Sequence, residues 1–134
     1  MSDFSLLFRQ YRERAGLSQN ALARRMGMNP AYVNRLERSG QGSGNRRLVE
    51  TAAEALGLDP VEKDTLLAAA GHLPAALAAA GPADPTLLLL ANTLADDGLS
   101  EEDKQDLRLV VRLVVQRWRQ AARLSPLPDQ PEKV

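Results

Sequence analysis

The sequence predicts an all-α protein. Apolar residues recur at helical spacing along most of the chain, and no run alternates apolar and polar residues as a half-buried strand would. Glycine and proline fall between the periodic segments, where they end one helix or begin the next. A chain of 134 residues fits one compact domain, or one small domain with an added element. We therefore expect a series of short helices in one or two parts.

Five short helices are expected in the first half of the chain. Ser18 and Asn29 are suitable N-caps for the second and third helices, because their side-chain oxygens accept hydrogen bonds from free N–H groups at a helix start. Pro30 follows at the first helical position, where its missing N–H costs nothing. Gly27 is expected to end the second helix. The predicted ranges are 4–15, 18–26, 29–38, 46–56 and 60–70.

The second half predicts one short helical piece followed by a pair of longer helices. Residues 74–85 are rich in Ala, Gly and Pro, and we expect one short helix between linkers there. Helices are predicted over about 85–95 and 100–123, the latter capped by Ser100 and begun by acidic residues that suit the helix dipole. We expect the proline-rich end to be disordered. The predicted parts are residues 1–73, a C-terminal helical segment at 74–124 and a tail at 125–134.

The net charge of zero hides two regions of opposite sign. Residues 9–47 contain nine arginines and two glutamates, whereas residues 48–134 contain eight basic and fourteen acidic residues. Arginine suits the recognition of phosphates and base edges better than lysine does. The first region is therefore expected to face a polyanion, and a coding bias toward arginine is the alternative explanation of its charge.

Several kinds of site are excluded or disfavoured. The chain has no cysteine, which excludes disulfides, thiolate metal sites and cysteine nucleophiles. No signal peptide is recognisable, and no apolar stretch approaches the ~20 residues of a membrane span, so we expect a soluble, cytoplasmic protein. The lone His72 lies at a helix end and is expected to be exposed or dipole-stabilised. No set of nucleophile, base and orienting group can be assembled, so we expect neither an enzyme nor a metal or cofactor site.

The second and third predicted helices meet at a tight corner. Gly27 supplies the positive φ that such a corner needs, and Ala23 is small enough for two helices to cross closely. Val33 and Leu36 lie one turn apart and would hold the third helix against the core together with Leu22 and Met26. The residues left on or beside the opposite face are Ala31, Asn34, Arg35 and Arg38. This arrangement is that of a helix-turn-helix motif, whose second helix enters the DNA major groove.

At these residues the sequence resembles the lambda-repressor-like (Cro/XRE-type) helix-turn-helix family of DNA-binding transcriptional regulators. The resemblance covers residues 6–67 and lies in the runs GLSQNALARRMGMNPAYVNRLERSG and LVETAAEALGLDPVEKDTLL. The characteristic positions are Gln19, Ala23, Gly27, Val33, Leu36 and Glu37. The resemblance implies a five-helix domain and, by family habit, a repressor that binds double-stranded DNA.

The resemblance also implies which residues contact DNA. The base-reading set is Pro30, Ala31, Asn34 and Arg35, and the phosphate-binding set is Gln19, Tyr32, Arg38, Arg46 and Arg47. Arginine can bind guanine and asparagine can bind adenine through two hydrogen bonds, whereas Pro30 and Ala31 offer only apolar contact to a thymine methyl. We therefore expect Arg35 and Asn34 to dominate base recognition. For Tyr32 a packing role, and for Arg47 a plain surface role, are the alternatives.

The last predicted helix contains an apolar stripe wider than one partner helix covers. Its members at helical spacing are Leu107, Val110, Val111, Val114 and Trp118. An apolar patch of this kind rarely stays bare, so the helical pair either forms a homodimer, which we prefer, or folds back on the first domain. Two other functions remain open for the second half: an antitoxin or other protein-binding adaptor, and a regulator gated by a small-molecule effector.

Overall fold

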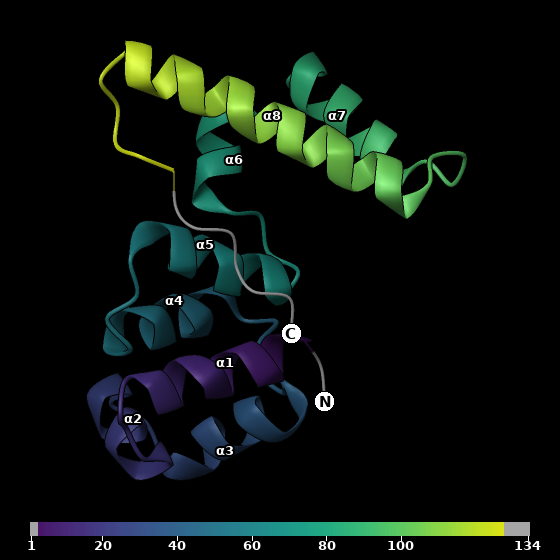
Figure 1. Cartoon of the computed structure of the whole chain (residues 1–134). Coiled ribbons are helices and arrows are strands. Elements are labelled where there is room, and N and C mark those ends of the chain that lie inside the picture. Colours follow the sequence, from purple (N-terminus) through teal and green to yellow (C-terminus); the bar gives the residue numbers. More distant parts are fainter. Residues whose placement is uncertain (1–2, 128–134) are drawn as a thin grey trace. The chain divides into compact units, whose positions relative to one another are not determined.

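A computed structural model describes residues 3–127, and in that range the chain forms eight helices and no strand (Figure 1). The predicted all-α fold, with a helix-turn-helix region followed by further helices, is confirmed. Helix ends lie within two residues of the predicted ones, and part of the predicted tail, residues 128–134, lies outside the described range. The helices are α1 Asp3–Arg14, α2 Gln19–Met26, α3 Pro30–Ser39, α4 Arg46–Ala55, α5 Pro60–Ala69, α6 Ala75–Ala80, α7 Pro85–Ala95 and α8 Glu101–Ala121.

The chain divides into two compact units, Met1–Gly81 and Pro82–Val134. The first unit contains α1 to α6, and the second contains α7 and α8. Within residues 3–127, no helix is both long and apolar enough to cross a lipid bilayer.

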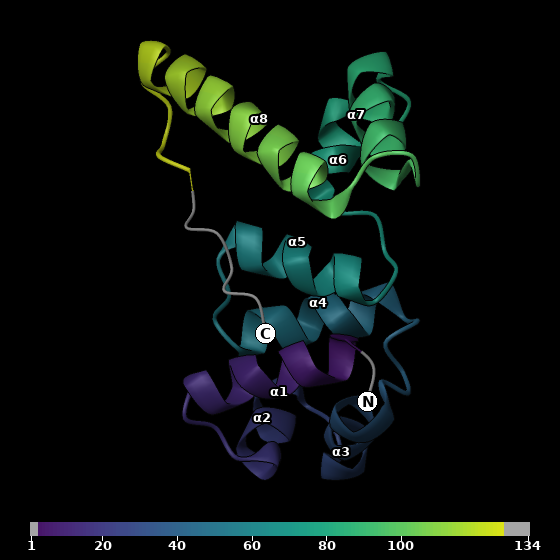
Figure 2. The same cartoon turned by 45° about the vertical axis from the view of Figure 1, so that its right-hand side comes forward.

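The first unit is built around one apolar core. Helix α1 lies between α3 on one side and α5 on the other, and α2 completes the end of the unit that contains α3 (Figures 1 and 2). Phe4 and Phe8 are buried one turn apart on α1, with ring centroids 5.7 Å apart. The buried apolar side chains from the other helices are Leu22, Ala23, Met26, Val33, Leu36, Val49, Ala52, Ala53, Leu56, Leu66 and Leu67. The predicted core residues of the corner, from Leu22 to Leu36, are all among them.

Polar contacts hold the helix ends of this unit in place. Asp59 and Glu62 form a reciprocal capping box at the start of α5, and Glu62 also pairs with Arg14 at the end of α1. The carboxylate of Asp64 accepts hydrogen bonds from the backbone N–H groups of Ala75 and Ala76, at 2.9 and 3.1 Å. This side chain on α5 therefore caps α6, and the short helix belongs to the first unit.

The second unit is a hairpin of two helices joined by residues 96–100 (Figure 2). Ser100 caps α8 by accepting a hydrogen bond from the backbone N–H of Asp103 at 3.0 Å, as predicted. Among described residues 82–127, Lys104 is the only buried side chain, and every apolar one is at least partly exposed. The hairpin therefore lacks the kind of core that closes the first unit.

Candidate nucleic-acid interface

The corner between α2 and α3 consists of residues 27–29. Gly27 has φ 68° and ψ 33°, a left-handed conformation that favours glycine, and an added Cβ would have no atom within 4 Å. The backbone N–H groups of Gly27 and Met28 donate to the carbonyls of Arg24 and Ala23, at 3.2 and 2.9 Å. This pair of bonds is a Schellman motif, which ends α2 and turns the chain into α3.

The start of α3 follows directly from the sequence. The side-chain oxygen of Asn29 accepts a hydrogen bond from the N–H of Ala31 at 2.9 Å, and Pro30 occupies the first helical position. Val33 and Leu36 are fully buried beneath the helix. Helix α3 is thus fixed to the core along one side, and its other side is available for contact.

The outer face of α3 is exposed and basic. Pro30, Ala31, Arg35 and Arg38 are all exposed on it. The Nε of Arg35 donates to the carbonyl of Ala31 at 3.2 Å, and its guanidinium lies 4.8 Å from the centroid of the Tyr32 ring. Tyr32 therefore packs against Arg35 on the surface, 48% exposed, where the two side chains form one stacked pair.

A buried ion pair on the inner side of α3 sets its position relative to α1. Arg12 on α1 donates from Nε and Nη2 to the two carboxylate oxygens of Glu37, at 2.8 and 2.6 Å. Its Nη1 donates to the carbonyl of Leu17 at 2.8 Å, and the Nε of Arg9 lies 3.7 Å from Glu37. A bidentate pair of this kind restricts both distance and orientation. It therefore holds α3 at one angle to α1.

The pKa of Glu37 reflects this environment. Burial opposes ionisation of the carboxyl, but hydrogen bonds from Arg12 and Gln19 and the charges of Arg12 and Arg9 outweigh it, so the pKa is lowered. The hydrogen bond to Glu37 raises the pKa of Arg12 correspondingly. The pair is therefore charged on both sides at neutral pH.

Gln19 connects this ion pair to the outer face. It hydrogen-bonds the carboxylate of Glu37, and its Oε1 accepts from the Nδ2 of Asn34 at 3.3 Å. Asn34 is half-buried rather than fully presented to solvent. Gln19, which is predicted to bind a phosphate, and Asn34, which is predicted to bind adenine, are therefore neighbours. Each side chain limits the rotation of the other.

A hollow of about 360 Å³ opens beside the first turn of α2. Its lining residues are Arg9, Arg12, Gln19, Glu37 and Arg38. Arg9 and Arg38 are exposed, although Arg9 also donates to Glu13 at 3.0 Å, and Arg12 is bound to Glu37. The hollow combines two accessible cations with the first residue of a helix, a combination that suits an anion such as a phosphate.

The loop before α4 is held more firmly than its glycines suggest. The ring Nε2 of His72 lies 2.7 Å from the carbonyl of Ser43, and this histidine is half-buried rather than exposed. Arg46 donates to Glu50 at 3.1 Å and to the carbonyl of Leu73 at 2.7 Å. Arg47 is exposed and has no carboxylate partner among residues 3–127. Of these two arginines, Arg47 is the more available to a phosphate.

The predicted dimerisation stripe divides between two sides of α8. Val110, Val114 and Trp118 are exposed. Leu107 and Val111 are half-buried, and Val111 lines a cavity of about 270 Å³ together with residues of α7. The structure thus adds Val111 to the packing of the hairpin itself.

Sequence reasoning missed the roles of Arg9 and Arg12 in this region. The two arginines were recognised only as part of a basic stretch, whereas they bind a glutamate 25 or more residues away. A signal was present in Glu37, which lies one turn after the core residue Val33 and so on the same side of the helix. A carboxylate at such a position needs a cation nearby.

A comparison with protein-family models agrees with this geometry. Residues 3–66 match a family model described as a helix-turn-helix domain. Residues 3–66 therefore form a domain of the helix-turn-helix family. Searches of curated proteins and of solved structures gave no match. The helix-turn-helix domain supports a DNA-binding role in regulation, and domains of this family are typically not enzymes.

Proposed function

We propose that this chain is a sequence-specific transcriptional regulator that binds double-stranded DNA as a homodimer and acts as a repressor. The observation that carries the proposal is the division of α3 into two sides. Val33, Leu36 and Glu37 are buried against the domain, whereas Arg35 and Arg38 are exposed on the outer surface. A helix presented in this way can enter the major groove of B-form DNA.

Base recognition depends mainly on Arg35 in this proposal. Its guanidinium is exposed and stacks on the ring of Tyr32, and it can bind O6 and N7 of a guanine with two hydrogen bonds. Asn34 can reach an adenine edge while its amide stays in contact with Gln19. Pro30 and Ala31 supply apolar contact at the start of the helix. Sequence-dependent DNA shape supplies the remaining discrimination.

Phosphate binding is assigned to the residues that surround this face. Gln19, Arg9 and Arg38 line the hollow beside α2, to which we assign one phosphate, and Arg38 is the main cation there because Arg9 already pairs with Glu13 and Glu37. Arg47 at the start of α4 is a second phosphate contact. Arg46 contributes less, because its guanidinium is already shared between Glu50 and Leu73. Such contacts position the protein on the duplex without reading its sequence.

Dimerisation and repression complete the proposal. The apolar side chains of α8 that remain exposed, Val110, Val114 and Trp118, are the surface on which two copies meet. A two-fold dimer reads two inverted half-sites about one helical turn apart. Occupation of such a site within a promoter blocks transcription.

Selection of bound duplexes from a random pool, with the full-length protein at fixed salt, tests the proposal. We expect enrichment of an inverted repeat whose half-sites lie about 10 base pairs apart, each with a guanine. Enrichment of an ungapped single site would contradict the homodimer. If no sequence is enriched while DNA is retained, the assignment of sequence-specific recognition is wrong.

Control by a small-molecule effector is a second candidate function. The cavity of about 270 Å³ between α7 and α8 is lined by Leu90, Leu94, Val111, Val115 and Leu127, with Arg108 and Arg112 beside them. An apolar cavity with a few polar groups is the usual form of a ligand site, and the exposed Arg108 suits an anionic group on an apolar ligand. Medium-chain carboxylates are the probe, and we expect an increase in Tm that the variant Val111→Trp abolishes. No increase with any chain length would contradict this function.

A further inference from the structure

Helix α8 has one side that nothing in its own hairpin covers. We call it the outer α8 face, and its apolar members are Val110, Leu113, Val114 and Trp118. They are 55%, 56%, 51% and 72% exposed, and in the described part of this unit no apolar residue is buried. A two-helix hairpin with an exposed apolar face is not expected to be stable alone. The outer α8 face therefore requires a partner.

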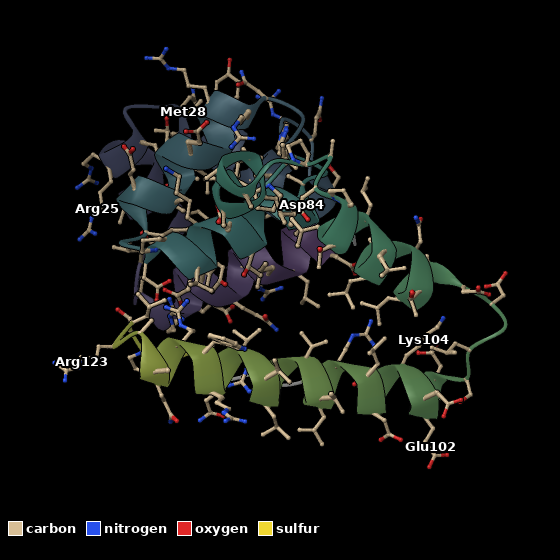
Figure 3. All side chains as sticks on the ribbon, turned by 90° about the horizontal axis from the view of Figure 1, so that it is seen from above. Arg25, Met28, Asp84, Glu102, Lys104 and Arg123 are labelled. Atoms are coloured by element: carbon tan, nitrogen blue, oxygen red, sulfur yellow. The ribbon has the colours of Figure 1, made fainter. Side chains whose placement is uncertain are left out.

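The opposite side of α8 packs toward α7. Val111 and Val115 line the cavity between the two helices, and Lys104 is buried on the same side (Figure 3). Glu102 points away from α7 in the same view. At about 100° per residue, the outer α8 face also includes Asp103, Asp106 and Arg117, all of which are exposed.

Charge is distributed unevenly along α8. Residues 101–106 contain four carboxylates and one lysine, whereas residues 107–123 contain five arginines and no acid. On the outer α8 face the residues are therefore acidic at the start, apolar in the middle and basic near the end. Asp103 and Asp106 come before the apolar group, and Arg117 immediately precedes Trp118, the last member of that group. Two such helices placed parallel would set Asp106 against Asp106 and Arg117 against Arg117. Placed antiparallel, they set each aspartate against an arginine.

We propose that the partner of the outer α8 face is α8 of a second copy, packed antiparallel around a two-fold axis midway between Val110 and Val114. Asp103 of each copy then lies opposite Ala121 of the other, and Asp106 lies within one residue of the level of Arg117, close enough for the two side chains to pair. The apolar side chains between the two ion pairs form the shared core. Like charges are separated only in this orientation, so the charges select the orientation and the apolar group supplies the affinity. The inference rests on the proposed homodimer and specifies how it is built.

Disulfide formation tests the orientation directly, because the chain contains no cysteine. The full-length variants Asp103→Cys and Ala121→Cys are oxidised separately and then as an equimolar mixture. A disulfide requires Cα atoms within about 7 Å, whereas residue 103 lies roughly 27 Å from its own copy in the antiparallel dimer. We expect covalent dimers in the mixture and none from either variant alone. Covalent dimers of each variant with itself would overturn the antiparallel arrangement.

Charge reversal gives a second, independent test by sedimentation. Asp106→Arg and Arg117→Asp should each weaken dimerisation at least tenfold, because symmetry creates two repulsive contacts, and the double variant should return to within about threefold of the parent. Gln105→Arg, on another side of α8, is the matched control and should change dimerisation less than twofold. Equal weakening by all four variants would overturn the proposal. Circular dichroism confirms that each variant retains its helices.

The outcomes also separate this inference from the proposed function. A dimer that links residue 103 to residue 103 overturns the orientation and leaves the homodimer intact. A protein that stays monomeric at every concentration overturns both. DNA recognition by α3 is measured separately on selected duplexes. The only tryptophan of the chain, Trp118, adds a readout, since its emission should shift to longer wavelength as the parent dimer dissociates on dilution.

Discussion

The two units of this chain are made of similar helices but bury their apolar side chains to very different extents. In the first unit Phe8, Leu36 and Leu66 are fully buried, whereas in the second Leu89 is 68% exposed and Trp118 is 72% exposed. Helical spacing of apolar residues thus predicts the helices in both units. The spacing does not show what covers the apolar faces of these helices. In the proposed function, the closed core positions α3 for DNA, and the open face of α8 binds a partner outside its own hairpin.

The largest expected effect is the loss of a core side chain in the first unit. Leu36→Ala should lower the free energy of unfolding by about 2–5 kcal/mol, because it removes a fully buried side chain and leaves a cavity. Leu89→Ala in α7 is the matched control and should cost less than about 0.5 kcal/mol. Urea denaturation of both variants measures the difference. Equal losses would show that the second unit has a core of its own.

A charge on the outer α8 face should abolish dimerisation without harming the first unit. Val114→Asp places a carboxylate in the proposed shared core, and we expect dimer dissociation to increase at least about 100-fold. Val111→Asp should act instead through the packing of α8 on α7, since Val111 lines the cavity between them. Sedimentation and operator binding measure both. An unchanged dimer in Val114→Asp would contradict the assignment of this face.

The ion pair between Arg12 and Glu37 should make the first unit sensitive to acid. The pKa of Glu37 in the folded chain lies below its ordinary value of 4.5, so its contribution is fully present above that pH and is lost as the pH falls through the folded pKa. Glu37→Gln should cost about 1.5–3 kcal/mol at neutral pH and should reduce the loss of stability in acid. Glu13→Gln, on the exposed surface of α1, should cost less than about 0.5 kcal/mol. An unchanged acid dependence in Glu37→Gln would contradict this role.

The smallest expected effects come from removing one equivalent helix cap in each unit. Asn29 caps α3 and Ser100 caps α8, each through one hydrogen bond from a backbone N–H. Asn29→Ala should lower global stability by about 1 kcal/mol, because α3 is part of the closed core. Ser100→Ala should leave global unfolding of the first unit unchanged and should increase hydrogen exchange at the start of α8. Equal losses of global stability in the two variants would mean that the two units unfold as one.

Much of the fold was predictable because local rules determine it. Asn29, Pro30 and Gly27 define the ends of α2 and α3 through capping and backbone conformation, and these depend only on neighbouring residues. The buried residues Val33 and Leu36 follow from helical spacing in the same way. Such features place α3 to within one residue.

The features that were not predicted all join distant parts of the chain. The pair between Arg12 and Glu37 and the contact between His72 and Ser43 depend on how the helices pack. The bond between Asn34 and Gln19 likewise needs the final angle between α2 and α3. Helical spacing and the family resemblance therefore predicted the residues of the candidate interface, but the network that orients them required the tertiary structure.

The most direct test of the central claim compares Arg35→Ala with Arg38→Ala on a selected duplex and on random DNA at the same salt. Arg35→Ala should cost about 1–3 kcal/mol on the selected duplex and little on random DNA, which reduces the ratio of the two affinities. Arg38→Ala should weaken binding to both duplexes equally and leave that ratio unchanged. If both variants lose the same affinity for random DNA and keep the parent ratio, α3 does not read the sequence through Arg35.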